Sequence, residues 1–214
     1  MSTRDRLVVA VAELLRVHGY SAVTVKQITA AARAPMGSLY HHFPHGKVQV
    51  AAEALRTSGA AYIQLLPLLM DPHEDLRVAV PAAFTEAART LEESGWMNMC
   101  PVGTVAGEIA DSEPSLREVT ADVIRDWIDQ GTAYFHARGL PEPAARDLIL
   151  AILTALEGAF ILGRTLRSSE PLHAAGRAMA ARIDALLNDI QDPVRTPPIS
   201  PGAQRARRTG SAAP

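Results

Sequence analysis

The sequence predicts an all-α protein of about nine helices, with a three-helix N-terminal domain and a larger helical body. Apolar residues recur with helical spacing along most of the chain, and no stretch of useful length alternates apolar and polar residues as a half-buried strand does. Pro, Gly and Ser signals cut the periodic stretches into segments of helix length. With 214 residues, 48% of them hydrophobic, the chain is large enough to bury a core.

Start and stop signals define the first two helices. One face of 3–18 is apolar, and Gly19 follows it as a stop signal. Thr24 and Gln27 have the spacing of a capping box, which predicts a second helix over 25–32. The apolar face of the first helix holds Leu7, Val11, Leu14 and Leu15, and a hydrophobic staple at the start of the second holds Val23 and Ile28.

The third helix is expected to be short. Pro35 can open a helix, because its missing N–H would be unpaired in the first turn, and Pro44 disfavours helical geometry at the preceding residue. These two prolines leave 36–42 as helix, with Met36, Leu39 and Phe43 on one face. Two short helices joined by a tight turn, the second polar on its outer face, predict a helix-turn-helix.

Further start and stop signals divide the rest of the chain into about six helices. They are expected near 47–66, 74–94, 100–110, 114–137, 143–167 and 171–190. The composition then becomes rich in Pro and Gly, which is typical of a disordered tail. We therefore expect a helix-turn-helix domain over 1–46, a helical body over 47–190 and a disordered tail over 191–214.

The charge of the chain is unevenly distributed. The formal net charge is −2, which argues against a protein that binds nucleic acid through bulk positive charge. Residues 1–50 carry +4, residues 51–200 carry −9 and residues 201–214 carry +3. A basic head on an acidic body is typical of a modular DNA-binding protein, and a solvated basic face without a partner is the alternative.

Cysteine usage and hydropathy predict a cytoplasmic protein. Cys100 is the single cysteine, which fits a reducing compartment, and the N-terminus lacks the pattern of a signal peptide. The apolar run 148–162 is interrupted by Thr154, Glu157 and Gly158 and is shorter than the roughly 20 residues that span a bilayer. We therefore expect a buried helix there and no membrane partner.

The N-terminal residues resemble the DNA-binding domain of TetR-family transcriptional regulators. The matching positions are Gly19-Tyr20, Val23-Thr24-Val25, Ile28, Ala32, Gly37-Ser38-Leu39-Tyr40-His41-His42-Phe43 and Lys47. The segment from Cys100 to Gly103 and the helices after it resemble the LmrA/YxaF-like branch. The chain departs from the family pattern at Arg33-Ala34-Pro35, where Gly-Val-Ser is usual, and at Thr29, where Ala is usual.

The resemblance implies two sets of DNA contacts. Thr24, Tyr40, His41 and Lys47 would bind the phosphate backbone, and Pro35, Met36 and Ser38 would lie nearest the bases. By their chemistry, Gly37 would let the backbone approach the duplex, and Lys26 would join Thr24 at a helix N-terminus suited to an anion. A half-buried packing role is the alternative for Tyr40. Three histidines lie close together in the sequence and could suggest a metal site, namely His41, His42 and His45. No cysteine or paired carboxylate is near them in sequence, so no metal or cofactor is expected.

A helix-turn-helix that reads one half-site is expected to work as a homodimer on a palindromic operator in double-stranded DNA. The helices near 143–167 and 171–190 resemble the dimer-forming pair of the family. The helix near 143–167 has a row of small side chains that would let a second helix approach it closely, namely Ala151, Ala155, Ala159 and Gly163. Packing within one chain would use such a row equally well.

The body holds large, adaptable apolar side chains that, in this family, often line a cavity for a small-molecule effector. Core packing is the alternative for each of them. Glu157 is the sole charge in the run 148–162; it could lie on a dimer surface, cap a helix or orient a cationic effector. The candidate lining residues are Phe84, Trp96, Met97, Met99, Cys100, Trp127 and Phe160.

These features predict a transcriptional repressor that a small hydrophobic effector releases from its operator, with the helix near 47–66 transmitting the change. An activator with the same DNA-binding mode and a helical partner-binding protein are the alternatives. Catalysis is not expected, because the sequence contains no G-x-G-x-x-G, P-loop, G-x-S-x-G or H-E-x-x-H motif, and Cys100 has no base nearby in sequence.

Overall fold

The computed structural model describes residues 1–109 and 112–191. This part of the chain is folded into helices without a strand, so the all-α prediction is confirmed. The helices are α1 (Thr3–His18), α2 (Val25–Ala31), α3 (Met36–His42), α4 (Lys47–Ile63), α5 (Leu65–Met70), α6 (Leu76–Glu93), α7 (Pro101–Ile109), α8 (Pro114–Ala137), α9 (Glu142–Leu166) and α10 (Glu170–Gln191).

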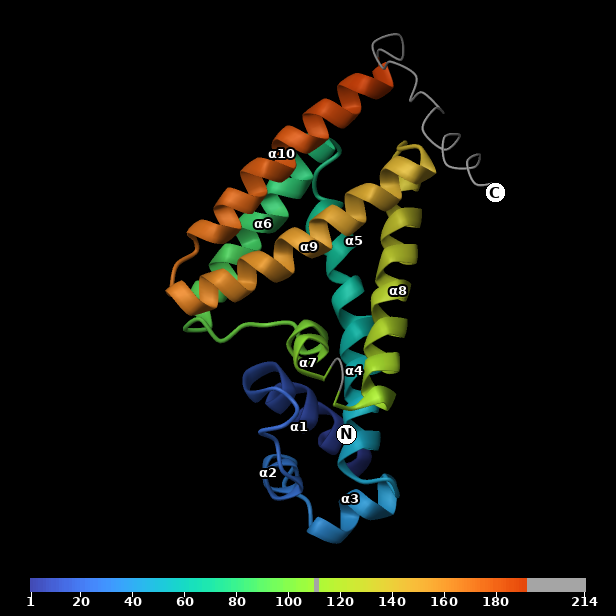
Figure 1. Ribbon diagram of the computed structural model, residues 1–214, viewed down its shortest axis with the longest axis vertical. Coiled ribbons are helices and arrows are strands. Elements are labelled where there is room, and N and C mark those ends of the chain that lie inside the picture. Colours follow the sequence, from blue (N-terminus) through green and yellow to red (C-terminus); the bar gives the residue numbers. More distant parts are fainter. Residues whose placement is uncertain (110–111, 192–214) are drawn as a thin grey trace, which may run out of the picture.

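The molecule is elongated, with a head of three short helices at one end (Figure 1). Helices α1, α2 and α3 form this head, and α4 runs from it into the body beside α8. At the far end α10 packs on α6, and α9 crosses between α8 and α10. Helix α7 is short and lies between the head and the rest of the body, in contact with α1, α4 and α8.

Local sequence signals explain where α2 begins. The Thr24 side chain accepts a hydrogen bond from the Gln27 N–H, and the Gln27 side chain accepts one from the Thr24 N–H at 2.8 Å, as the predicted capping box requires. Val23 and Ile28 are both buried, as expected for a hydrophobic staple. A second capping box, between Ser2 and Asp5, starts α1 and was not predicted.

The predicted helix over 47–66 is divided in the structure. Helix α4 ends at Ile63, and α5 begins at Leu65 after a single intervening residue. Pro67, the residue directly after the predicted helix, lies in the first turn of α5, where a residue without an N–H costs no helical hydrogen bond. The Pro67 carbonyl accepts a hydrogen bond from the Asp71 N–H at 2.9 Å and so closes this short helix.

Two clusters of buried side chains form the core. The first joins the head to the lower body, since Leu7 and Leu39 share it with Val50, Val105 and Leu116. The second fills the upper body, between α6, α8, α9 and α10. The first cluster therefore extends across the boundary expected at residue 46. Apart from Gln191 at the end of α10, the tail expected over 191–214 lies outside the described residues.

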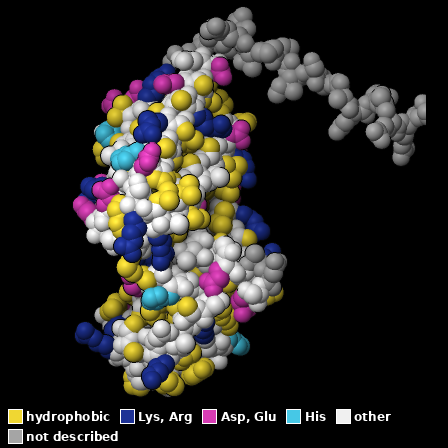
Figure 2. All heavy atoms as spheres, turned by 60° about the vertical axis from the view of Figure 1, so that its left-hand side comes forward, with side chains coloured by type: hydrophobic (Ala, Val, Ile, Leu, Met, Phe, Trp, Pro, Cys, Tyr) yellow, Lys and Arg dark blue, Asp and Glu magenta, His cyan; other side chains and the backbone are white. Residues whose placement is uncertain are grey.

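Helix α9 is only partly buried, so the expectation of a buried helix is correct for one face alone. It is long and apolar enough to cross a membrane by length and composition, a weak criterion that core helices also meet. Its exposed face carries large apolar side chains, namely Leu150, Ile161, Leu162 and Leu166. In Figure 2, hydrophobic side chains gather on the body, and Lys, Arg and His side chains lie at the surface of the head below it.

Candidate DNA-binding surface and internal cavity

The short helix α3 presents an exposed face built from apolar and aromatic groups. Leu39 and Phe43 are buried in the head, but Met36 is 54% exposed and Tyr40 is 53% exposed. The expectation that Met36 shares the inner face is therefore wrong, because as the first residue of the helix it lies beyond the edge of the core. The Tyr40 ring also packs beside Gly46, where an added Cβ atom would lie 3.2 Å from it, so a contact with DNA and a packing role both remain open for this residue.

The other predicted contacts surround this face. Lys26, Pro35 and His41 are exposed, and Ser38 is half-buried. Thr24 is also exposed, although its hydroxyl already serves the capping box. A Cβ atom on Gly37 would meet nothing within 4 Å, so this position is open to solvent and leaves room for a close approach of DNA. The structure brings these residues to one end of the molecule.

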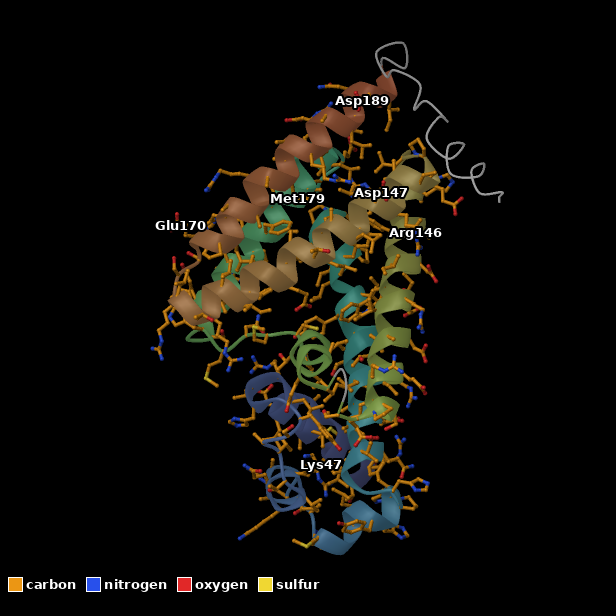
Figure 3. All side chains as sticks on the ribbon, in the orientation of Figure 1. Lys47, Arg146, Asp147, Glu170, Met179 and Asp189 are labelled. Carbon is orange, nitrogen blue, oxygen red and sulfur yellow. The ribbon has the colours of Figure 1, made fainter. Side chains whose placement is uncertain are left out.

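Lys47 lies at the junction of the head and the body rather than on a free surface. It is the first residue of α4 (Figure 3). Its Nζ atom lies 4.0 Å from the centre of the Tyr20 ring. Burial lowers the pKa of Lys47, while the nearby Glu108 acts to raise it. A phosphate contact by Lys47 would therefore form beside an existing cation–π contact.

Two departures from the family pattern lie in α2 and in the turn that follows it. Arg33 has φ +51°, the left-handed conformation in which the usual glycine has no steric cost. Thr29 is buried, and its hydroxyl donates to the carbonyl of Val25 at 3.0 Å and to that of Lys26 at 3.2 Å. Its polar group is thereby satisfied inside the helix, so threonine is accommodated where alanine is usual.

The body encloses a cavity of about 520 Å³. Its walls come from α4, α5, α6, α8 and α9 and from the segment before α7, and they are almost entirely apolar. Leu65 and Leu68 line it and are also exposed, so α5 forms its mouth. A volume of this size suits a drug-sized ligand.

Five of the seven predicted lining residues reach this cavity: Phe84, Met99, Cys100, Trp127 and Phe160. Trp96 and Met97 do not. The chain turns sharply after α6, where Gly95 and Trp96 both have positive φ and the Trp96 N–H bonds the Leu91 carbonyl at 3.0 Å. This turn directs Trp96 away from the cavity and leaves Met97 at the surface.

Sequence reasoning missed the α4 and α5 side of the cavity, including Tyr62. The Tyr62 hydroxyl donates to the Met99 carbonyl at 3.2 Å, and burial raises the pKa of this phenol to about 12. Burial and the nearby Glu157 raise the pKa of the Cys100 thiol to about 12. Cys100 is therefore a protonated lining residue and not a nucleophile.

Helix α7 connects the cavity to the head. Its start adjoins the cavity residues Met99 and Cys100, and near its other end the Glu108 carboxylate accepts hydrogen bonds from the N–H groups of Tyr20 and Ser21 at 2.6 and 2.7 Å. Burial acts to raise the pKa of Glu108, but these hydrogen bonds and Lys47 outweigh it and lower that pKa. The carboxylate therefore binds the turn between α1 and α2 in its charged form.

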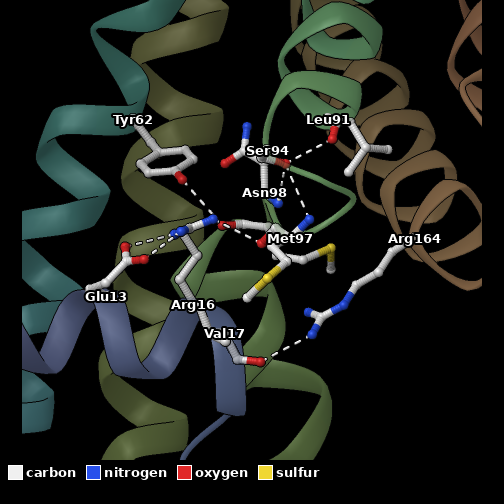
Figure 4. Close-up of polar contacts among 10 residues, drawn as sticks. Glu13, Arg16, Val17, Tyr62, Leu91, Ser94, Met97, Asn98 and Arg164 are labelled. Atoms are coloured by element: carbon white, nitrogen blue, oxygen red, sulfur yellow. Dashed lines mark hydrogen bonds and ion pairs between the residues drawn. The ribbon is translucent and has the colours of Figure 1, made fainter. Parts of the chain in front are cut away.

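Two arginines add further bonds between the head and the body (Figure 4). Arg16, at the end of α1, donates to the Met97 carbonyl at 2.8 Å and pairs with Glu13 on its own helix. Arg164, on α9, donates to the Val17 carbonyl at 3.0 Å. The end of α1 is therefore fixed to the segment before α7 and to α9.

The predicted row of small residues on α9 packs largely within the chain. Ala159 and Gly163 are buried, and a Cβ atom on Gly163 would lie 2.8 Å from Leu91 Cδ2. Gly163 approaches α6 and the segment after α9, and both positions are covered by the chain itself, so neither is available at the surface for a second copy. Ala151 and Ala155 are half-buried on the same helix.

Comparison with known proteins places these features in a family. Residues 7–54 match the bacterial regulatory proteins of the tetR family, and residues 77–178 match the C-terminal domain of LmrA/YxaF-like transcriptional regulators. YxaF of Bacillus subtilis (strain 168), an uncharacterized HTH-type transcriptional regulator, is 29% identical over 170 residues, which are 79% of this chain and 89% of YxaF. The HTH-type transcriptional regulator LmrA of the same organism is 27% identical over 170 residues, 79% of this chain and 90% of LmrA.

Solved structures agree with this relationship. The crystal structure of a TetR transcriptional regulator from Chloroflexus aurantiacus J-10-FL has a TM-score of 0.68 and 28% identity, and the match covers 85% of this chain and 94% of that chain. The two family matches together cover more than two thirds of the sequence, and the relatives are transcriptional regulators rather than enzymes. The chain therefore belongs to the TetR family of DNA-binding transcriptional regulators, in its LmrA/YxaF-like branch.

Proposed function

We propose that this protein is a homodimeric repressor that binds a palindromic operator and is released by a small hydrophobic effector. The observation that carries the proposal is the cavity of about 520 Å³, whose wall continues into α7 and through it to the head. A ligand in this cavity would touch the segment that positions the DNA-binding helices. We place the protein in the cytoplasm, where its DNA partner lies.

The exposed face of α3 and the turns beside it support the DNA-binding part of the proposal. Met36 and Tyr40 project from the recognition helix, and Lys26 and Arg33 add charge on either side. The N-terminal 50 residues carry +4. Base edges would be read from the first turn of α3, and the charged side chains would fix the register on the phosphates.

The exposed apolar face of α9 supports the dimer. Leu150, Ile161, Leu162 and Leu166 lie on it, and α10 adds a row of exposed alanines, Ala174, Ala178, Ala181 and Ala185. Figure 3 labels Arg146 and Asp147 near the start of α9 and Glu170, Met179 and Asp189 along α10, which runs beside it. An exposed apolar surface of this kind marks an interaction site. In this dimer the second copy would contact the exposed face of α9, and not Ala159 and Gly163, through which the sequence predicted the contact.

Transmission would use α4 together with α7. Val50 and Ala51 of α4 lie in the core shared with the head, whereas Tyr62 and Ile63 of the same helix line the cavity. A ligand that displaces the end of α4 or the start of α7 would therefore change the position of the head, and with it the spacing of the two recognition helices in the dimer.

A DNA-binding measurement tests the proposal. An operator is first selected from random duplexes with the wild-type protein, and its affinity is measured by fluorescence anisotropy at several salt concentrations. We expect a palindrome, a Kd that rises steeply with salt, and a loss of binding in Tyr40→Ala. Arg125→Ala, which removes an exposed charge from α8, is the matched control and should bind normally. Salt-independent binding, or selection of no palindrome, would contradict the proposal.

A further inference from the structure

We propose that the effector is a hydrophobic molecule with a protonated amine, and that Glu157 binds its ammonium group. This inference rests on the proposed function, because it names the ligand class of the same cavity. Among the described residues that line the cavity, two are acidic, Glu86 and Glu157, and none is Lys, Arg or His. The cavity wall is thus mainly apolar, and both of its ionisable carboxyl groups can carry a negative charge.

The two acidic side chains differ in their surroundings. Glu86 is half-buried on α6 and accepts a hydrogen bond from Arg89 Nε at 2.8 Å, so its charge is balanced. Glu157 is half-buried on α9, and in the described part of the chain no basic side chain forms an ion pair with it. Only Glu157 therefore offers a charge that a ligand could neutralise.

The position of Glu157 is defined by α7. A Cβ atom on Gly103 would lie 2.1 Å from Glu157 Oε2, so the carboxyl group packs directly on the backbone of the first turn of α7. The Cys100 thiol lies beside it and is protonated. Neither neighbour supplies a positive charge, and glycine at position 103 leaves the space that the carboxyl group occupies.

Burial makes this arrangement costly for the protein alone. It raises the pKa of Glu157, since a carboxylate without an ion-pair partner loses hydration in an apolar site, and the hydrogen bond with the Cys100 thiol offsets only part of this effect. An ammonium group beside the carboxylate would restore the balance of charge, whereas an anionic ligand would add to the repulsion. The aromatic rings in the walls would attract the same cation through their faces. They belong to Tyr62, Phe84, Trp127 and Phe160.

The same contact would place the ligand at the start of the path to the head. Glu157 touches the first turn of α7, and Glu108 near the other end of α7 holds the turn between α1 and α2. A cation that draws the Glu157 carboxylate toward the cavity would remove its packing from Gly103. Recognition of the ligand and movement of α7 would then depend on one side chain.

Three probes that share one aromatic body test the ligand class: 1-naphthylmethylammonium, 1-naphthalenemethanol and 1-naphthoate. Their affinities for the full-length protein are measured by isothermal titration calorimetry without DNA. We expect the ammonium probe to bind tightest and the carboxylate weakest. In Glu157→Gln the affinity for the ammonium probe should fall by roughly ten- to a hundredfold, while that for the alcohol stays the same.

Glu86→Gln is the matched control, because it removes the other lining carboxylate and should leave the preference for the ammonium probe unchanged. Unchanged alcohol binding in Glu157→Gln shows that the cavity is intact. Equal binding of the three probes, no binding of any of them, or an ammonium affinity that Glu157→Gln does not change would overturn the inference. A clear ammonium preference without any effect on operator binding would instead contradict the proposed function.

Discussion

Arg33 occupies the tight turn of the helix-turn-helix in a conformation that favours glycine. Its φ of +51° costs a side chain about 1 kcal/mol relative to glycine. We predict that Arg33→Gly raises the free energy of unfolding by about 0.5–1 kcal/mol, since part of the gain is offset by the flexibility of glycine in the unfolded chain. Thermal unfolding followed by circular dichroism measures this change.

The same residue is a candidate phosphate contact because it is exposed beside α3. If Arg33 neutralises a phosphate, Arg33→Gly also lowers the slope of log K against log salt by about 0.9 per protomer. Arg33→Lys keeps both the charge and the backbone cost, so it is the control for both effects. A stability that does not change in Arg33→Gly would refute the account of the turn.

Glu157 is expected to reduce stability at neutral pH. Burial raises its pKa in the folded state, so the folded protein holds this proton more tightly than the unfolded chain does. Stability is therefore lost as pH rises from the unfolded pKa through the raised folded pKa. We predict that Glu157→Gln has a higher Tm than the wild type at pH 7.5, and that the difference disappears below about pH 4, near the ordinary carboxyl pKa.

Thermal unfolding across this pH range checks the prediction. Glu118→Gln, an exposed position on α8, provides the comparison and should show no such trend. A Glu157→Gln variant that is less stable than the wild type at pH 7.5 would mean that the carboxylate is held by favourable contacts, and the argument for a missing cation would then fail.

At the scale of elements, α7 is the connection between cavity and head. We predict that Glu108→Gln, which removes the charged acceptor of the Tyr20 and Ser21 N–H groups, weakens the coupling between effector and operator by severalfold but leaves effector affinity in the absence of DNA unchanged. Glu92→Gln, on the exposed side of α6, is the control. If Glu108→Gln keeps the coupling of the wild type, the claim that α7 transmits the change is wrong, and α4 alone would transmit it.

The prediction for the dimer concerns the exposed apolar face of helix α9. Leu162 is 54% exposed, and a charge placed there would be buried without a partner if a second copy covers this face. We predict that Leu162→Arg shifts the dimer to monomer in light scattering at micromolar concentration and abolishes tight operator binding. Val78→Arg, at a similarly exposed position on α6, should remain dimeric. A dimeric Leu162→Arg variant would exclude this face of α9.

Elements with local signals were predictable from the sequence, and contacts between distant elements were not. The capping box at Thr24 and the two prolines around α3 fixed the head to within a residue, because these signals act over four or five positions. The predicted dimer row does not hold at Ala159 and Gly163, because small residues have the same spacing whether their partner is in the same chain or in another one; for Ala151 and Ala155 it stays a prediction. The Glu108 contact joins residues 87 and 88 positions apart, which no local pattern encodes.

The cavity was predictable in composition but not in outline. Five of seven expected lining residues reach it, since large apolar groups on the central helices gather there. Trp96 and Met97 were wrongly expected to line it, because the positive φ of Gly95 and Trp96 turns the chain at this point and a positive φ at tryptophan has no sequence signal. The helix predicted over 47–66 was expected to end before Pro67, but Pro67 lies in the first turn of α5, which forms part of the cavity wall.

At the scale of the molecule, charge and shape separate the two functions. A head region of +4 lies at one end of an elongated body whose sequence over residues 51–200 carries −9. Repulsion between this body and phosphates limits contact with DNA to the head, so non-specific affinity should be low and should fall with salt. The cavity is lined by residues of the body and not of the head, so an effector bound there would have to act on the proposed DNA contacts through the connecting helices.

Reciprocal linkage between the cavity and the operator tests the central claim most directly. The Kd for the selected operator is measured with and without saturating 1-naphthylmethylammonium, and the Kd for this probe is measured with and without the operator. The account predicts that both constants rise by the same factor, on the order of 5- to 150-fold. A probe that binds the free protein but leaves the operator affinity unchanged would contradict it.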